Sequence, residues 1–124
     1  MNLVDSCGWL EYFADGPNAG FFMRAVEATD QLVVPTICIL EVFKRVLEQR
    51  GEEAALQAAA HMQEGHVVDM DVGTALEAAR IAAALKLPLA DSVILATARA
   101  CGAVVWTQDA DFDGIAGVRY KQKR

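Results

Sequence analysis

Apolar and polar residues follow two different patterns along the chain. Short segments rich in apolar and β-branched residues end abruptly at polar ones, which is typical of strands buried in a sheet. Longer segments between them repeat apolar residues every three or four positions, as on one face of a helix. The pattern predicts strands at 1–4, 31–35, 66–70 and 103–106, a short edge strand at 118–121, and helices at 6–15, 18–27, 37–49, 52–64, 72–85 and 90–100.

Residues that favour helix ends support these boundaries. Asn18 and Thr36 precede two of the helices and are predicted to cap them with their side chains. Gly51 and Gly102 follow helices and are predicted to end them. Pro88 separates the last two helices, because proline cannot continue a helix from the preceding turn.

Strands that alternate with helices predict an α/β fold. Such an order builds βαβ units with a parallel sheet and right-handed crossovers. The chain has 124 residues, no internal repeat and no linker-like segment, so we expect one domain over residues 1–124. Hydrophobic residues make up 54% of the chain and charged residues 23%, as in a globular protein.

The sequence also indicates where in the cell the protein is located. Charged residues interrupt every apolar segment before it reaches the length of a membrane span, and the first residues lack the pattern of a secretory signal. Cys7, Cys38 and Cys101 are odd in number and lie in apolar segments, so we expect small buried side chains rather than disulfides or a zinc site. We therefore expect a cytoplasmic protein that does not contact the membrane.

The net charge of −6 argues against a protein that binds nucleic acid by bulk attraction. Basic residues do gather in two places, on a predicted helix and at the end of the chain. They are either solvated surface charges or contacts for the phosphates of a nucleic acid. Lys44 and Arg45 are weak candidates for such phosphate contacts. The two groups are Lys44, Arg45 and Arg50, and Arg119, Lys121, Lys123 and Arg124.

Two carboxylates follow predicted strands directly. Asp5 comes after residues 1–4, and Asp109 comes just after residues 103–106, with Asp111 two positions further on. If these strands are parallel neighbours, Asp5 and Asp109 meet at the carboxyl edge of the sheet, where open α/β folds place their sites. The alternative is that each aspartate only caps the helical segment that follows it.

Glu41 and Asp91 are lone charges within apolar segments, 37–43 and 87–95. A carboxylate buried in such surroundings costs several kcal/mol unless it is paired or bound to a cation. As alternatives, Glu41 could face solvent and pair with Arg45 four residues on, and Asp91 could cap its helix after Pro88.

The four acids together indicate a metal site. Two carboxylates about 4 Å apart repel by about 4 kcal/mol in protein-like surroundings, so four that converge must take up protons, separate or bind a divalent cation. An all-oxygen ligand set without nearby His or Cys favours Mg²⁺ or Mn²⁺. A bound cation would also reverse the local charge and allow an anionic substrate to approach.

Four segments resemble the acidic blocks of PIN-domain ribonucleases, in particular VapC-type toxins of toxin–antitoxin pairs. They occur in the family's order and span nearly the whole chain. In sequence letters they are DSCGWLEYF from Asp5, PT with EV and KR from Pro35 to Arg45, LADS with ILATA from Leu89, and TQDADF from Thr107.

The resemblance implies a PIN-like three-layer α/β/α sandwich around a parallel sheet of four to five strands in the order 3-2-1-4-5. It implies an endoribonuclease that uses one or two Mg²⁺ or Mn²⁺ ions, a cognate antitoxin as partner, and a toxin homodimer. The metal-binding and catalytic acids would be Asp5, Glu41, Asp91 and Asp109, with Asp5 and Asp91 as principal ligands. Ser6, Thr107 and Asp111 would be accessory residues of the same site.

Two other functions remain open from the residues alone. Asp5 could be the nucleophile of a phosphohydrolase, although Cys7 stands where a haloacid-dehalogenase-like site has a second aspartate. The chain could also be an inactive PIN-like scaffold that only binds a partner. Metal-dependent RNA cleavage that depends on Asp5 would distinguish the ribonuclease from both.

Overall fold

A five-stranded parallel sheet forms the centre of the computed structural model, which describes all residues from Met1 to Arg124. The strand order is β3-β2-β1-β4-β5, as the family resemblance implies. The strands are β1 (Asn2–Val4), β2 (Leu32–Pro35), β3 (His66–Val68), β4 (Val104–Thr107) and β5 (Val118–Tyr120).

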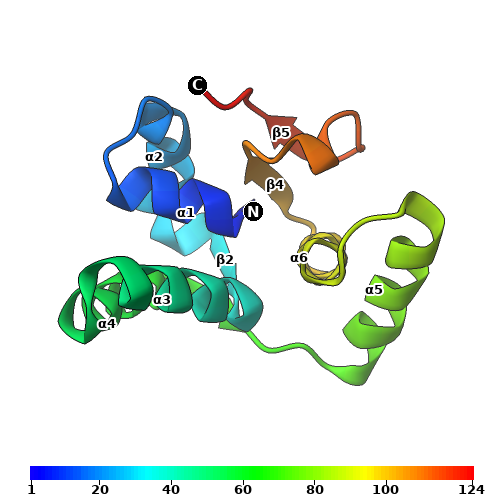
Figure 1. Cartoon of the computed structure of the whole chain (residues 1–124). Helices are drawn as coiled ribbons and strands as arrows, with labels where there is room; N and C mark the ends of the chain where they lie inside the picture. The colour runs from blue at the N-terminus through cyan, green and yellow to red at the C-terminus, as the bar shows by residue number, and fades with distance from the viewer.

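Six α-helices cover the sheet, with α1 to α4 on one side of the strands and α5 and α6 on the other (Figure 1). Consecutive helices pack in pairs, α1 with α2, α3 with α4, and α5 with α6. The helices are α1 (Ser6–Phe13), α2 (Ala19–Glu27), α3 (Thr36–Arg50), α4 (Glu52–Met62), α5 (Val72–Leu85) and α6 (Leu89–Ala100), with short 3₁₀ helices η1 (Thr29–Gln31) and η2 (Ala110–Phe112).

The core lies between the sheet and both helical layers. Leu3 and Val4 of β1 are both fully buried, which is expected of a central parallel strand with helices on both faces. Trp9, Phe22 and Phe112 are the largest fully buried side chains. No single helix is long and apolar enough to cross a membrane; α5 and α6 reach the required composition only as a pair bent by 119°.

One predicted helix cap is wrong, and a second is right only in position. Thr36 is the first residue of α3 rather than its cap, because the extended backbone of Pro35 already occupies the capping position. Asn18 does occupy the capping position of α2, but its side chain makes no capping hydrogen bond. Its side chain instead donates to Gln108 and to the backbone of Gln122, two acceptors from the other end of the chain. By contrast Gly51, with φ of 90°, ends α3 as predicted.

The strand register brings the ends of β1 and β4 together. Val4 pairs with Trp106, and the backbone N–H of Asp5 donates to the carbonyl of Trp106 at 3.0 Å. The residues that follow these strands therefore lie at the same carboxyl edge of the sheet. Thr107, expected in the turn after the strand, is the last residue of β4.

The contact between α1 and α2 requires a residue without a side chain at position 8. A Cβ atom on Gly8 would lie 2.7 Å from ring carbons of Phe22 and 2.7 Å from a methyl group of Val4. We expect Gly8→Ala to lower the free energy of unfolding by about 1–3 kcal/mol, as overpacking typically does. Urea denaturation measures this change.

Gly20→Ala is the matched control, because no atom lies within 4 Å of a Cβ at that position. It should leave stability unchanged or raise it by up to about 1 kcal/mol, since alanine is the better helix former. Equal stability of the two variants would contradict the packing argument.

Candidate functional site

Asp5 connects β1 to α1 and lies almost entirely buried at the carboxyl edge of the sheet. Its Oδ1 accepts a hydrogen bond from the Ser6 backbone at 2.8 Å, so it does cap α1. Its Oδ2 accepts from Thr107 Oγ1 at 2.8 Å and from Cys7 Sγ at 3.2 Å. Burial raises the pKa of Asp5, and the hydrogen bonds from Thr107, Cys7 and Ser6 oppose that rise. The capping role and the place in the site are thus compatible.

The hydroxyl groups of Ser6 and Thr107 connect the acids to one another. Thr107 Oγ1 donates to Asp5 and accepts from the backbone N–H of Asp109 at 2.9 Å. Ser6 Oγ donates to Glu41 Oε1 at 2.7 Å and so links α1 to α3. Both hydroxyl side chains are buried and hold carboxylates that come from different elements.

Glu41 lies on α3, partly buried, and does not pair with Arg45. The ion pair between Arg80 and Glu77 is the one salt bridge in the structure, so the predicted alternative for Glu41 is wrong. The reason is that α3 packs against α1 and α6, which turns Glu41 toward Ser6 rather than along its own helix.

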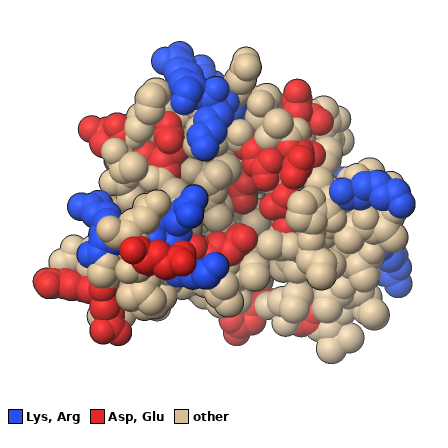
Figure 2. Space-filling view, viewed as in Figure 1, with Lys and Arg blue, Asp and Glu red and all other residues tan.

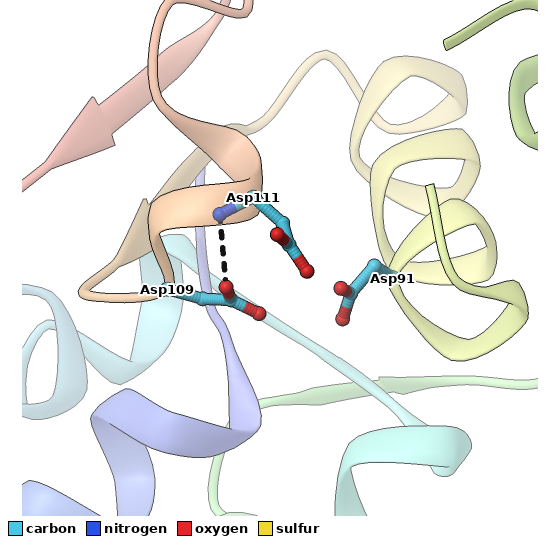
Figure 3. Close-up of side chains that lie close together, drawn as sticks. All are labelled: Asp91, Asp109 and Asp111. Atoms are coloured by element: carbon cyan, nitrogen blue, oxygen red, sulfur yellow. Dashed lines mark hydrogen bonds between the residues drawn. The ribbon is translucent and has the colours of Figure 1, made fainter. Parts of the chain in front are cut away.

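Asp91, Asp109 and Asp111 form the tightest group of acids. On the face drawn in Figure 2, acidic side chains gather between α6 and the C-terminal segment. Figure 3 shows the three carboxylates turned toward one another, and one ligand oxygen from each lies within 4.8 Å of the others. Asp109 caps η2 by accepting from the Asp111 backbone at 2.9 Å. Asp91 lies in the first turn of α6 and is not its cap, since Pro88 holds that position.

All four other acids influence Asp91. Its pKa is raised from 3.8 to about 7, mostly by burial and further by repulsion from Asp5, Asp109, Glu41 and Asp111, in that order. Asp91, Asp109 and Asp111 thus form one group, including Asp111, which the resemblance gave only as accessory. Asp5 and Glu41 lie outside that group but close enough for their charges to raise the pKa of Asp91.

These residues fit a hard divalent cation. Every acidic donor is a carboxylate oxygen, and Mg²⁺ binds such oxygens at about 2.0–2.1 Å in an octahedral arrangement. Oxygens around one such ion lie about 3–4 Å apart, and the group formed by Asp91, Asp109 and Asp111 already lies within 4.8 Å. The donor chemistry and the spacing agree with the predicted Mg²⁺ or Mn²⁺.

Cys7 is the residue whose place at the site the sequence did not predict. Its thiol contacts Asp5, although no cysteine was expected near the acids. Burial and the nearby Asp5 charge raise the pKa of Cys7 to about 12, so the thiol stays protonated and donates a hydrogen bond. No sequence signal marked it, because the contact depends on how α1 starts. Of the two basic candidates, Arg45 lines a groove that reaches Cys7, and Lys44 is not among its lining residues.

The comparisons with known proteins agree with this geometry. The family model described as PIN domain matches residues 3–118. The chain belongs to the PIN-domain family. No curated protein matches it.

Solved structures with the same fold include VapC toxins. A toxin–antitoxin complex from Klebsiella pneumoniae is 25% identical, with a TM-score of 0.79 and coverage of 96% of each chain. VapC20 of Mycobacterium tuberculosis, described as a sarcin-ricin loop cleaving toxin, is 17% identical, with a TM-score of 0.77 and coverage of 94% of this chain and 95% of that one. DNA-bound VapBC from Salmonella typhimurium is 20% identical, with a TM-score of 0.75 and coverage of 98% of each chain. The predicted PIN-like fold is confirmed.

The raised pKa of Asp91 predicts how pH changes the stability of the protein in a chelating buffer. Folded Asp91 holds its proton up to about pH 7, whereas an unfolded aspartate loses it near 3.8. The folded state thus binds more protons in this window, and stability should fall as pH rises from about 4 to about 7 and then level off. Thermal unfolding at a series of pH values in EDTA measures this.

Asp91→Asn is the control, because it removes the titrating group with little change in shape. In this variant most of the pH dependence of stability should disappear. The pH dependence that remains should come from Asp5, whose pKa is also raised. An unchanged profile in Asp91→Asn would contradict the assignment. Added Mn²⁺ should restore stability of the wild type above pH 7.

Proposed function

We propose that this protein is a Mg²⁺- or Mn²⁺-dependent endoribonuclease and the toxin of a toxin–antitoxin pair in the cytoplasm. The convergence of five carboxylates from distant parts of the chain on one edge of the sheet carries this proposal. Membership of the PIN-domain family supports nuclease activity, and a toxin that cleaves RNA is among the proteins with the same fold.

Asp5 and Asp91 are proposed as the principal ligands. Asp5 has the largest effect on Asp91 of the four other acids, as expected of two carboxylates that face one site. Asp109 and Glu41 would ligate directly or through water, and Asp111 joins the ligand set because its carboxylate groups with Asp91 and Asp109. When bound, one or two ions would supply a polarised water and positive charge for phosphodiester hydrolysis.

The protein's own groups hold this set in place and handle the proton. Thr107 and Cys7 fix the orientation of Asp5, and Ser6 fixes Glu41, so the carboxylates need little rearrangement when a substrate arrives. Glu41 and Asp109 are the candidates to accept the proton of the attacking water, because neither is buried as deeply as Asp5.

The alternatives explain the site less well. A scaffold that only binds a partner gains nothing from five acids that repel one another. A phosphohydrolase would need Asp5 as a free nucleophile, but both of its oxygens already accept hydrogen bonds, which lowers their nucleophilicity.

Asp5→Asn tests the proposal directly. The wild type should cleave RNA with Mg²⁺ or Mn²⁺ and not with EDTA, and Asp5→Asn should cleave at least about 100-fold more slowly, since a lost charged ligand costs several kcal/mol and each 1.36 kcal/mol is tenfold. Calorimetric titration with Mn²⁺ should show weaker binding in the same variant.

Asp113→Asn is the matched control, because Asp113 is an exposed aspartate close by that is not part of the acid group. It should cleave like the wild type. A phosphate trapped covalently on Asp5 would instead favour the phosphohydrolase, and a wild type that cleaves no RNA with either metal would favour the scaffold.

The proposed partners are an antitoxin and a second copy of the toxin. Complexes of toxin and antitoxin are among the proteins with the same fold. A cavity of about 210 Å³ next to the start of α3 supports an antitoxin contact, because apolar residues line it and Leu40 there is 60% exposed.

Leu40→Asp tests this contact. The toxin assignment predicts that a small antitoxin is encoded immediately upstream of this gene. With that protein the wild type should form a complex that no longer cleaves RNA, and Leu40→Asp should bind it at least about tenfold more weakly. Leu56→Asp is the control, because Leu56 on α4 is 56% exposed and lies outside that cavity. Equal losses in both variants would contradict the assignment.

A further inference from the structure

A groove leads away from the acids between α1, α3 and the C-terminal residues. It has a volume of about 310 Å³ and is lined by residues that include Arg45, Arg50 and Lys123. A second cavity, of about 490 Å³, contains Asp109 in its wall. The two cavities adjoin, because Cys7, Gln108 and Lys123 line both. The groove is therefore continuous with the acidic edge of the sheet.

The groove carries positive charge in a protein whose net charge is −6. None of its three cations forms an ion pair. Its one acid, Glu11, is already engaged: its oxygens accept from the backbone N–H of Asn18 at 2.7 Å and from the side chain of Gln108 at 3.4 Å. In Figure 2, basic side chains appear over α3 and around the C-terminus on either side of this part of the face.

A buried network holds the C-terminal residues against the groove. Asn18 is 2% exposed, and its Nδ2 donates to Gln108 Oε1 at 2.9 Å and to the Gln122 backbone carbonyl at 3.1 Å. The backbone of Lys121 is fixed as well, because its N–H donates to the carbonyl of Thr107 at 2.9 Å. The two residues before Lys123 are thus held in place, which positions Lys123 beside the groove.

We propose that this groove binds backbone phosphates of the RNA strand on one side of the bond that is cut, with Arg45, Arg50 and Lys123 as the phosphate contacts. The inference rests on the proposed function. A single ligand must satisfy both the groove and the adjoining acid group. An RNA strand does so, because it carries a charge on every nucleotide: one phosphate lies at the metal-loaded acids and its neighbours lie along the cations. An acidic peptide could bind in the groove, but it would make no favourable contact with the adjoining acid group.

The test measures binding separately from cleavage. Asp5→Asn protein, in which we expect cleavage to be too slow to interfere, is titrated into short fluorescent oligouridylate with Mg²⁺ at several salt concentrations. Arg45→Ala, Arg50→Ala and Lys123→Ala together should weaken binding at least tenfold at low salt. The slope of log affinity against log salt should fall by about 0.7 for each lost contact, or about 2 for all three. Oligoadenylate should give the same losses, since phosphate contacts read no sequence.

Two further variants sharpen the result. Arg24→Ala removes an exposed arginine on α2 outside the groove and should change neither affinity nor slope. Asn18→Ala should weaken binding when Lys123 is present and have less effect in the Lys123→Ala background, because its proposed role is to position that residue. Urea denaturation verifies that each variant is folded.

The outcomes separate this inference from the proposed function. Suppose that the triple variant binds RNA with unchanged affinity and salt slope, while the wild type cleaves RNA and Asp5→Asn does not. The groove assignment is then wrong and the nuclease proposal stands. If the triple variant keeps RNA binding and loses binding of polyglutamate, the groove is a site for an acidic protein. If the wild type neither cleaves RNA nor binds it, both proposals fail.

Discussion

Repulsion among carboxylates at one edge of the sheet is the constraint on which the site depends. Acids that follow β1 and β4 and acids on α3 and α6 lie there, and burial together with their repulsion raises the pKa of Asp91. The fold tolerates this cost because the parallel strands β1 and β4 and the packed helices fix the backbone around it. A site that repels itself in this way is poised to bind a cation.

Neutral donors make the arrangement possible. Thr107, Ser6 and Cys7 give hydrogen bonds to Asp5 and Glu41 without adding positive charge. An arginine or lysine in their place would neutralise the acids and compete with a metal ion. The basic residues of this face lie instead along the adjoining groove, where they are free of ion pairs with the acids. Negative and positive regions thus lie side by side and remain separate.

Local and tertiary roles coincide at two of the acids. Asp5 caps α1 and Asp109 caps η2, and each also faces the acid group. Capping uses one carboxylate oxygen, and at Asp5 the other oxygen is oriented by Thr107 and Cys7. Glu41 has no such local role, because it neither caps its helix nor pairs within it. Asp91 is not a cap either, although its place in the first turn of α6 favours the helix dipole.

Local sequence patterns were enough to predict the helices and strands and to identify the acids. Periodicity located all five strands and six helices, with the 72–85 helix at its observed bounds, because burial imposes a local repeat that can be read along the chain. Asp5, Glu41, Asp91 and Asp109 stood out because each is a lone charge after or within an apolar segment. The strand order came from the family resemblance, since local patterns do not specify which strands are neighbours.

The partners of these side chains, in contrast, depend on how distant segments pack together. Asn18 looked like a helix cap, but its partners Gln108 and Gln122 are 90 and 104 residues away. Cys7 looked like a core residue, and Asp111 like a minor one, until the start of α1 and the turn of η2 set their directions. Side-chain contacts between distant segments depend on how helices pack on the sheet. This packing geometry produces no periodic pattern in the sequence from which the contacts could be predicted.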